Sequence, residues 1–216
     1  MKIANILSLS TAAISLALLA PQLARSQGAG SMNIANAGGN QAAAQQEAKQ
    51  MVPAEVHLER ALDARKERQG DQFEALLDGK VHLADGTELE HGTVLVGKIV
   101  TDQMRPGGNS RLALKFTEAK LRDGKVIPIH AMIAGISGPS ENFGYLQNSD
   151  GPPNWTRGSL QIDEIGVEPQ LDLHSRVAGA NSGVLVSSTK DDVKLAAGSR
   201  MTLAIAARNA ESSGGA

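Results

Sequence analysis

The sequence predicts a mostly β protein, a small antiparallel β-barrel or sandwich of about seven to nine short strands. Asp-Gly pairs at Asp78, Asp85 and Asp123 stand beside short runs in which apolar and polar residues alternate. Gly adopts positive φ freely and Asp tolerates it, so these pairs favour the tight turns of antiparallel hairpins. The 216 residues include one Trp, one Tyr and three Phe. The core must therefore consist mainly of Val, Ile, Leu and Ala.

The N-terminus has the pattern of an export signal. Lys2 supplies a positive charge, residues 3–20 form an apolar run without charges, and the stretch 24–26 places small residues where a signal peptidase reads. The apolar run is also just long enough to stay as a membrane anchor, which is the alternative. We expect residues 1–26 to be a signal peptide that is cleaved near Gln27. This predicts a periplasmic or secreted protein, which contacts a membrane only if the signal segment is kept.

Residues 27–51 consist mainly of Gln, Ala, Asn and Gly. So few apolar side chains cannot offset the entropy that is lost when a segment becomes ordered. The composition predicts a flexible, low-complexity and disordered tether, with at most a short helix near 41–50. The tail, residues 209–216, is also expected to be flexible. The β domain is expected to cover residues 52–208.

Within the β domain, strands are predicted wherever every second residue is apolar. In residues 72–77, for example, Phe73, Ala75 and Leu77 fall on one face. Residues 61–71 are charged and end in Gly-Asp, which is typical of a loop. The expected strands, in chain order, are 54–60, 72–77, 81–83, 94–100, 111–117, 125–136, 183–188 and 200–206.

Residues 137–180 break this pattern, because they are rich in Gly, Pro, Ser and Asn. A loop of this length is uncommon unless it is functional or disordered. We expect a long loop that holds one strand or a short amphipathic piece in 159–173. An aromatic residue in an exposed loop can anchor a partner, so Phe143, Tyr145 and Trp155 are the candidate partner-binding residues. The alternative is that Trp155 folds back as a lid on the domain.

The residues from Gly92 to Lys98 match the GxxxxGK pattern of a phosphate-binding loop. Such a loop needs Ser or Thr next, to hold magnesium, and a helix whose N-terminus faces the phosphate. Ile99 follows here, and the intervening Thr, Val, Leu and Val favour an extended strand. The pattern is therefore interpreted as a strand in which Gly97 marks a bend or a close backbone approach.

No catalytic, cofactor or metal-binding residue is assigned. The five His are scattered, Cys is absent, and no spacing typical of zinc ligands occurs. By alternation, His57 and His130 fall opposite the apolar face, where a solvated side chain is the simplest interpretation. The net charge is −2 and becomes more negative without residues 1–26, which carry two basic residues. This balance argues against a nucleic-acid partner.

An exported hydrolase or carbohydrate-active protein is the alternative function. Its site would lie in the 137–180 loop and use Asp150, Asp163 or Glu164. Two catalytic carboxylates would have to converge at roughly 5–9 Å in a cleft, whereas neighbouring residues on a strand point to opposite faces. We therefore expect a protein that is not an enzyme and has no cofactor.

Four segments within residues 62–136 follow one another in a specific order. They read QGDQFEALL, LADGTELEHGTVLVGKIV, SRLALKF and LRDGKVIPIHAMI. In this order the chain resembles the C-terminal β-barrel domain of the TrbI-like scaffold family of conjugation and type IV secretion, although the 137–180 insert departs from the family pattern. The resemblance implies a barrel that serves as a scaffold, and it assigns no functional residues. We expect an exported cell-envelope module that binds another protein, or a second copy of itself, through exposed strand edges or the Trp155 loop.

Overall fold

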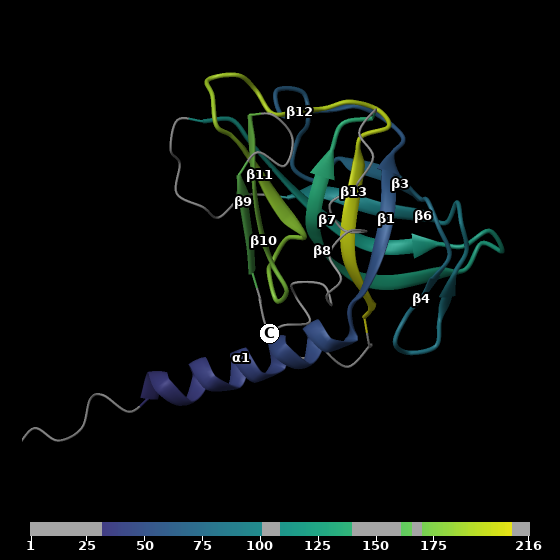
Figure 1. Cartoon of the computed structure of the whole chain (residues 1–216), viewed down its shortest axis with the longest axis vertical. Helices are drawn as coiled ribbons and strands as arrows, with labels where there is room; N and C mark the ends of the chain where they lie inside the picture. Colours follow the sequence, from purple (N-terminus) through teal and green to yellow (C-terminus); the bar gives the residue numbers. More distant parts are fainter. Residues whose placement is uncertain (1–31, 101–108, 140–160, 166–169, 209–216) are drawn as a thin grey trace, which may run out of the picture.

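The structure is a computed structural model that describes residues 32–100, 109–139, 161–165 and 170–208 (Figure 1). These residues form one helix, α1 (Met32–Gln50), and thirteen strands numbered in chain order. The strands are β1 (Val52–Leu58), β2 (Leu62–Asp63), β3 (Gln72–Leu77), β4 (Val81–His82), β5 (Glu88–Leu89), β6 (Val94–Val100), β7 (Arg111–Lys120), β8 (Val126–Ser137), β9 (Gln161–Ile165), β10 (Leu171–Arg176), β11 (Gly183–Ser187), β12 (Lys194–Leu195) and β13 (Arg200–Ala207).

The main sheet has nine antiparallel strands in the order β6-β3-β1-β13-β8-β7-β11-β10-β9. Since β6 also pairs with β7, the strands from β6 to β7 in this order close into a six-stranded barrel. The strands β11, β10 and β9 continue the sheet from β7 and lie to the left of the barrel in Figure 1. Two short ribbons, β12-β2 and β4-β5, complete the described strands. The prediction of a mostly β fold with a small antiparallel barrel is confirmed.

Apolar side chains from all six barrel strands fill the interior. The rings of Phe73 in β3 and Phe116 in β7 meet edge to face there, with centroids 5.2 Å apart and planes at 74°. Aromatic rings prefer this arrangement over direct stacking. Inward positions recur at every second residue, as in Val56 and Leu58 of β1. The interior is thus a packed core, and contacts with other molecules fall to the outer surface.

Gly97 in β6 allows the ring of Phe73 to approach the β6 backbone. A Cβ atom at Gly97 would lie 2.5 Å from Cε1 and 2.7 Å from Cε2 of that ring. The register between β6 and β7 also shifts between Val96 and Gly97, as in a β-bulge. The predicted strand with a close approach at Gly97 is therefore confirmed, and the GxxxxGK pattern is not a phosphate-binding loop.

The strands β7 and β8 pair next to their shared turn and then diverge. Ser182, directly before β11, joins them beyond that point. Its N–H donates to the Leu114 carbonyl of β7, and its carbonyl accepts from the Ile133 N–H of β8, both at 2.8 Å. Its hydroxyl oxygen accepts a hydrogen bond from the Phe116 N–H at 3.0 Å. One buried serine therefore closes the seam between the two strands.

Two of the three Asp-Gly pairs form hairpin turns as predicted. Gly86 between β4 and β5 and Gly124 between β7 and β8 have φ values of 86° and 84°. The prediction is wrong for Asp78-Gly79, because β3 pairs with β1 and β6 and not with the next strand. There the carboxylate of Asp78 contacts Nδ1 of His57 at 2.5 Å. Asp78, directly after β3, therefore binds His57 of β1 instead of forming a tight turn.

Helix α1 is longer than the short helix that residues 41–50 predict, and it occupies most of the expected flexible tether, 27–51. Ala, Gln, Glu and Lys are strong helix formers, and this property does not depend on an apolar stripe. Ala44 and Ala48 lie one turn apart and are both buried. Their small side chains let the end of the helix lie close to the barrel, so packing adds to the intrinsic propensity.

The predicted long loop, 137–180, is partly wrong, because β9 and β10 both lie inside it. In β10, the buried Leu171 and Leu173 alternate with the half-buried Asp172 and His174. The alternation is therefore regular, but it spans only a short run next to residues rich in Gly and Pro. Residues 140–160 lie outside the described part of the chain.

The predicted loop 61–71 also packs closely against the barrel. It contains β2, which pairs with β12. At its start Arg60 binds Glu67 through two hydrogen bonds, Nη1 to Oε1 at 2.5 Å and Nη2 to Oε2 at 2.9 Å. Nη2 also donates to the Gln72 carbonyl at the start of β3. The hydrogen bond to Glu67 raises the pKa of Arg60, and the Glu67 side chain is only 8% exposed.

Glu67→Gln is expected to lower the free energy of unfolding by about 1–2 kcal/mol, because an amide cannot replace the bidentate, charged contact with Arg60. Thermal unfolding followed by circular dichroism measures this loss. Asp192→Asn is the matched control, since the Asp192–Arg65 pair is longer, at 3.4 Å, and more exposed. Such pairs contribute little. Equal losses in the two variants would contradict the importance of the Arg60–Glu67 contact.

Candidate functional site

The residues predicted to bind a partner, Phe143, Tyr145 and Trp155, lie outside the described residues, as does Asp150. Their roles stay predictions. Among the residues that the structure describes, no group of three or more His, Cys, Asp or Glu side chains could hold a metal ion. In the same part of the chain, no helix is sufficiently long and apolar to cross a membrane.

Asp163 and Glu164, named for the alternative hydrolase, lie in β9 at successive positions. Asp163 is paired with His174 and Glu164 with Leu173 of β10. Successive residues of a strand alternate between the two faces of the sheet. The backbone therefore does not bring these two acids to a common face, as a pair of catalytic carboxylates would require.

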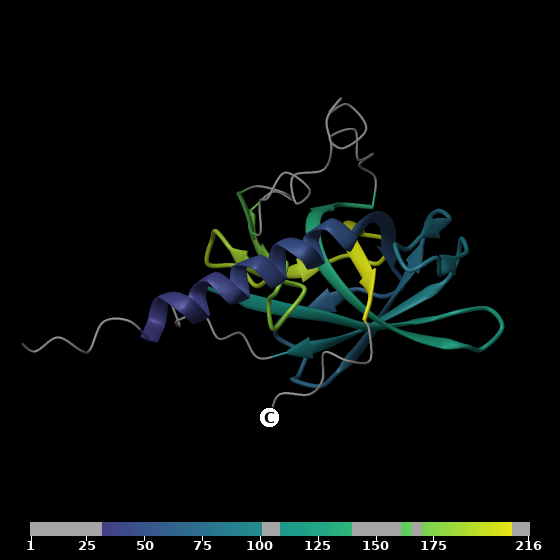
Figure 2. The ribbon, with the colours of Figure 1, turned by 90° about the horizontal axis from the view of Figure 1, so that it is seen from below.

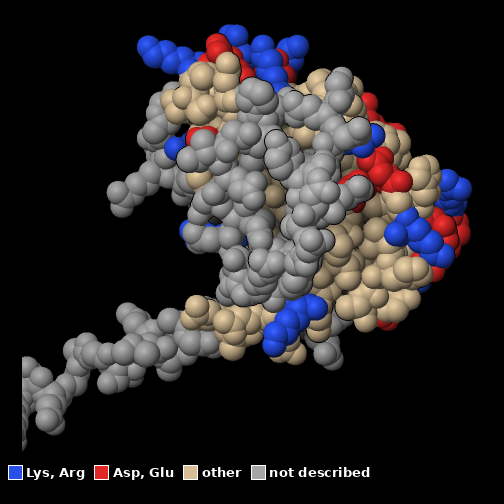
Figure 3. Space-filling model, in the orientation of Figure 1, with Lys and Arg blue, Asp and Glu red and all other residues tan. Residues whose placement is uncertain are grey.

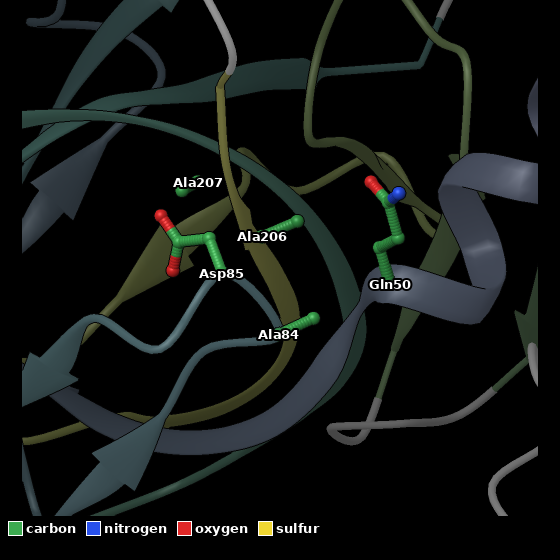
Figure 4. Close-up of a pocket in the computed structure, with 5 residues that line it drawn as sticks. All are labelled: Gln50, Ala84, Asp85, Ala206 and Ala207. Atoms are coloured by element: carbon green, nitrogen blue, oxygen red, sulfur yellow. The ribbon is translucent and has the colours of Figure 1, made fainter.

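A small pocket lies where the end of α1 approaches the β4–β5 turn and the end of β13 (Figure 4). It has a volume of about 160 Å³ and is lined by Gln50, Ala84, Asp85, Ala206 and Ala207. The Asp85 carboxylate is already used by the turn, because it accepts hydrogen bonds from the Thr87 N–H and hydroxyl at 2.9 and 3.0 Å. Ligand pockets commonly measure about 300–1,000 Å³. This one is a crevice between packed elements rather than a substrate site.

The outer face of β8 and β13 carries a second apolar cluster, which the end of α1 covers. Figures 1 and 2 show α1 passing beneath the barrel, with its N-terminal part extending away from the sheet. The contact consists mostly of small side chains, so the helix and the sheet can lie close together. The cluster contains Ala48, Met51, Met132, Ala134, Val177, Ala204 and Ala206.

His130 of β8 adds a polar link to this contact. Its Nε2 lies 2.6 Å from the Val177 carbonyl oxygen and 3.5 Å from Oε1 of Glu47 in α1. Both His57 and His130 lie opposite the barrel interior, as alternation predicts. The interpretation of His130 as a solvated side chain is wrong, since it is only 16% exposed. Strand alternation alone does not indicate that a helix covers this outer face.

Ala48→Leu is expected to loosen α1 while the barrel stays folded, because the contact has room for a methyl group and the larger side chain overpacks it. Amide hydrogen exchange in residues 41–50 should accelerate by about tenfold, the equivalent of about 1.4 kcal/mol. Exchange in the barrel strands should stay unchanged. Ala43→Leu is the matched control, because Ala43 is exposed on the same helix. Similar acceleration in both variants would contradict this description of the contact.

Charged side chains of both signs lie next to one another along the top and right margins of the face in Figure 3. On the β4–β5 hairpin, Nζ of Lys80 lies 2.5 Å from Oε1 of Glu88, and Nδ1 of His82 lies 3.3 Å from Oε2. The hydrogen bond between them raises the pKa of Lys80 and lowers the pKa of Glu88. Exposed pairs of this kind stabilise a protein little, and a mixture of signs is not the pattern of a phosphate-binding face.

The outer edge of β9 is a further candidate surface among the described residues. Within the described residues, β9 has a single strand neighbour, β10, whereas every barrel strand has neighbours on both sides. A free edge presents unpaired N–H and C=O groups, to which another chain can add a strand. The sequence predicts exposed strand edges, but periodicity does not indicate which strand ends a sheet.

Comparisons with known proteins assign no family. No family model matches the chain, and no curated protein matches it. Among solved structures, the chain is similar to ComB10 of the Com type IV secretion system of Helicobacter pylori, at 10% identity and a TM-score of 0.35, over 73% of this chain and 88% of that chain. At this score the likeness carries no argument about fold or function. The barrel that the TrbI-like resemblance implies is present in the structure itself, and membership of that family stays a prediction.

Proposed function

We propose that this protein is a non-enzymatic module of the cell envelope that binds another protein, or a second copy of itself, through its β domain. The observation that supports this most is the outer edge of β9, which has no strand neighbour among the described residues, next to a barrel that is closed and has a packed interior. A packed barrel with an open strand edge suits strand addition. The resemblance of residues 62–136 to TrbI-like barrels favours a scaffold in secretion or conjugation, and the signal-like residues 1–26 favour a periplasmic or secreted location.

The test is photo-crosslinking of the tagged full chain in its host, followed by fractionation and identification of the crosslinked proteins. We expect one defined partner, or a self-crosslink, in the envelope fraction. The mass of the purified protein should correspond to a chain that begins near Gln27. A monomeric protein without crosslinks, or one confined to the cytoplasm, would overturn the proposal.

Gly97→Val serves as the matched control for this capture experiment. The substitution places a branched side chain against the Phe73 ring. It should disrupt the barrel, although it replaces no residue of the outer surface. A partner that recognises the folded domain should be lost in this variant. It should be retained in Ala43→Leu, which changes an exposed position on α1.

A further inference from the structure

We propose that Asp78-Gly79 is a site of spontaneous covalent modification, at which the backbone cyclises to a succinimide and reopens partly as isoaspartate. The pair lies in a bend directly after β3. Asp-Gly sequences suit this reaction, because Gly has no side chain to hinder its own nitrogen when that nitrogen attacks the carboxyl group. Three such pairs lie in the described residues, beginning at Asp78, Asp85 and Asp123. Their hydrogen bonds single out the first.

The attacking nitrogen is available at Gly79. Among the described residues, the Gly79 N–H donates no hydrogen bond, and a Cβ atom at this position would meet nothing within 4 Å. The nitrogen is therefore neither held by an acceptor nor crowded. The N–H of Asp78 donates to the Glu55 carbonyl at 2.8 Å, which keeps the other half of the pair in place next to β1.

His57 supplies the proton that the reaction needs. Its Nδ1 lies 2.5 Å from Oδ1 of Asp78, which is within reach of direct proton transfer. The imidazolium form of His57 passes this proton to Oδ1 while the Gly79 nitrogen attacks Cγ. A C–N bond forms and the Cγ–Oδ1 bond breaks. Oδ1 then leaves as one water molecule, with the proton from His57 and the amide proton of Gly79.

The second carboxylate oxygen of Asp78 also favours the succinimide. This atom, Oδ2, is buried and has no hydrogen-bond partner among the described residues. An ionised oxygen without a partner is costly in such a place, and in the succinimide the same oxygen is an uncharged carbonyl. Water then opens the ring. Opening at Cγ restores Asp, and opening at the former main-chain carbonyl gives isoaspartate.

The other two described pairs are held in turns that oppose the reaction. The N–H groups of Gly86 and Gly124 donate to backbone carbonyls, each at 3.0 Å. The carboxylates of Asp85 and Asp123 each accept a hydrogen bond at 2.9 Å from the N–H two residues further on, as Asp often does in turns. Cyclisation there must first break both hydrogen bonds. These two pairs therefore serve as internal controls.

Isoaspartate at position 78 would add one carbon to the main chain and move the carboxylate away from His57. The reaction would thus remove the side-chain contact between the end of β3 and β1. The modification is built into the chain itself, since its only other reactant is water.

Incubation of the full chain in water enriched in the heavy oxygen isotope tests the proposal, because each ring opening adds one labelled oxygen. Trypsin, used in ordinary water, then separates the three pairs into the peptides 69–80, 81–98 and 123–125. A fourth pair, Asp150-Gly151, lies outside the described residues and falls in the peptide 126–157. Fragmentation in the mass spectrometer locates the label within each peptide.

In the folded chain, label should enter Asp78 at least about fivefold faster than Asp85 or Asp123, a factor that corresponds to one intramolecular hydrogen bond. In concentrated urea the three rates should become similar, because the contacts that distinguish the pairs are lost. Equal rates in the folded chain, or no label at Asp78, would overturn the proposal.

Two variants test the chemistry at this pair. Gly79→Ala should slow the labelling of Asp78, since the added methyl group crowds the attacking nitrogen, while the free space around it keeps the fold intact. His57→Gln keeps a hydrogen-bond donor but has no proton to transfer, so labelling of Asp78 should slow at least about tenfold. Labelling of Asp85 and Asp123 should stay unchanged in both variants, and thermal unfolding checks that both are folded. An unchanged rate in His57→Gln would overturn the role of His57 as the proton donor.

Discussion

Gly97→Ala is expected to destabilise the protein by about 2–3 kcal/mol, near the upper end of what overpacking usually costs. The added Cβ would overlap the Phe73 ring, which is 1% exposed and packs edge to face on Phe116. Movement of the ring would disrupt its packing on Phe116, and movement of the β6 backbone would break its pairing with β3 and β7. The loss of chain entropy in the unfolded state favours Ala by only about 0.4–1 kcal/mol, so the steric term dominates. Urea denaturation followed by circular dichroism measures the change.

Gly79→Ala is the control for this substitution. A Cβ at Gly79 meets nothing within 4 Å, so the free energy of unfolding should stay within about 0.5 kcal/mol of the natural chain. Phe73→Leu should restore part of the stability when it is combined with Gly97→Ala, because the smaller side chain vacates the overlap. Additive losses in the double variant would contradict the close contact between Gly97 and Phe73.

Ser182→Ala is expected to cost about 1–3 kcal/mol, which is the penalty for a buried polar group that loses its partner. The hydroxyl of Ser182 accepts a hydrogen bond from the Phe116 N–H, and both residues are buried. Removal of that oxygen leaves the N–H unpaired in the seam between β7 and β8. Urea denaturation should show the loss of stability, and hydrogen exchange should show faster exchange of the Phe116 amide.

Ser199→Ala provides a strict comparison. Ser199 is 0% exposed, and its Oγ has no hydrogen-bond partner among the described residues. Replacement of an unpaired buried hydroxyl by a methyl-sized group should be neutral or stabilising. Two equally destabilised variants would show that the loss comes from the removed volume and not from the hydrogen bond at the seam.

The strands could be predicted well where one face is packed and the other is not. In 72–77 and 200–206, every second residue enters the barrel core, so the period of two appears directly in the sequence. The turns at Gly86 and Gly124 could be predicted equally well, because each needs a residue with a positive φ. Asp78-Gly79 misled the prediction, because the same two residues serve a side-chain contact with His57.

The surfaces of the protein were harder to predict. Local periodicity does not indicate which strands become neighbours. Neither the closure of the barrel nor the position of β9 at the end of the described sheet could therefore be inferred. The long α1 arises from helix propensity together with a close contact made by Ala44 and Ala48. Because the segment has few large apolar residues, this contact could not be predicted from its composition. For the candidate site, the sequence pointed to Trp155 and its neighbours, whereas the described residues point to β9.

The pairing of β1 with β13 sets the order in which this domain can assemble. Val52 lies opposite Ile205 and His57 opposite Arg200, so one wall of the barrel needs both ends of the β domain. During synthesis, the sheet therefore stays incomplete until the final strand, β13, has been made. Such intermediates expose unpaired strands that aggregate readily.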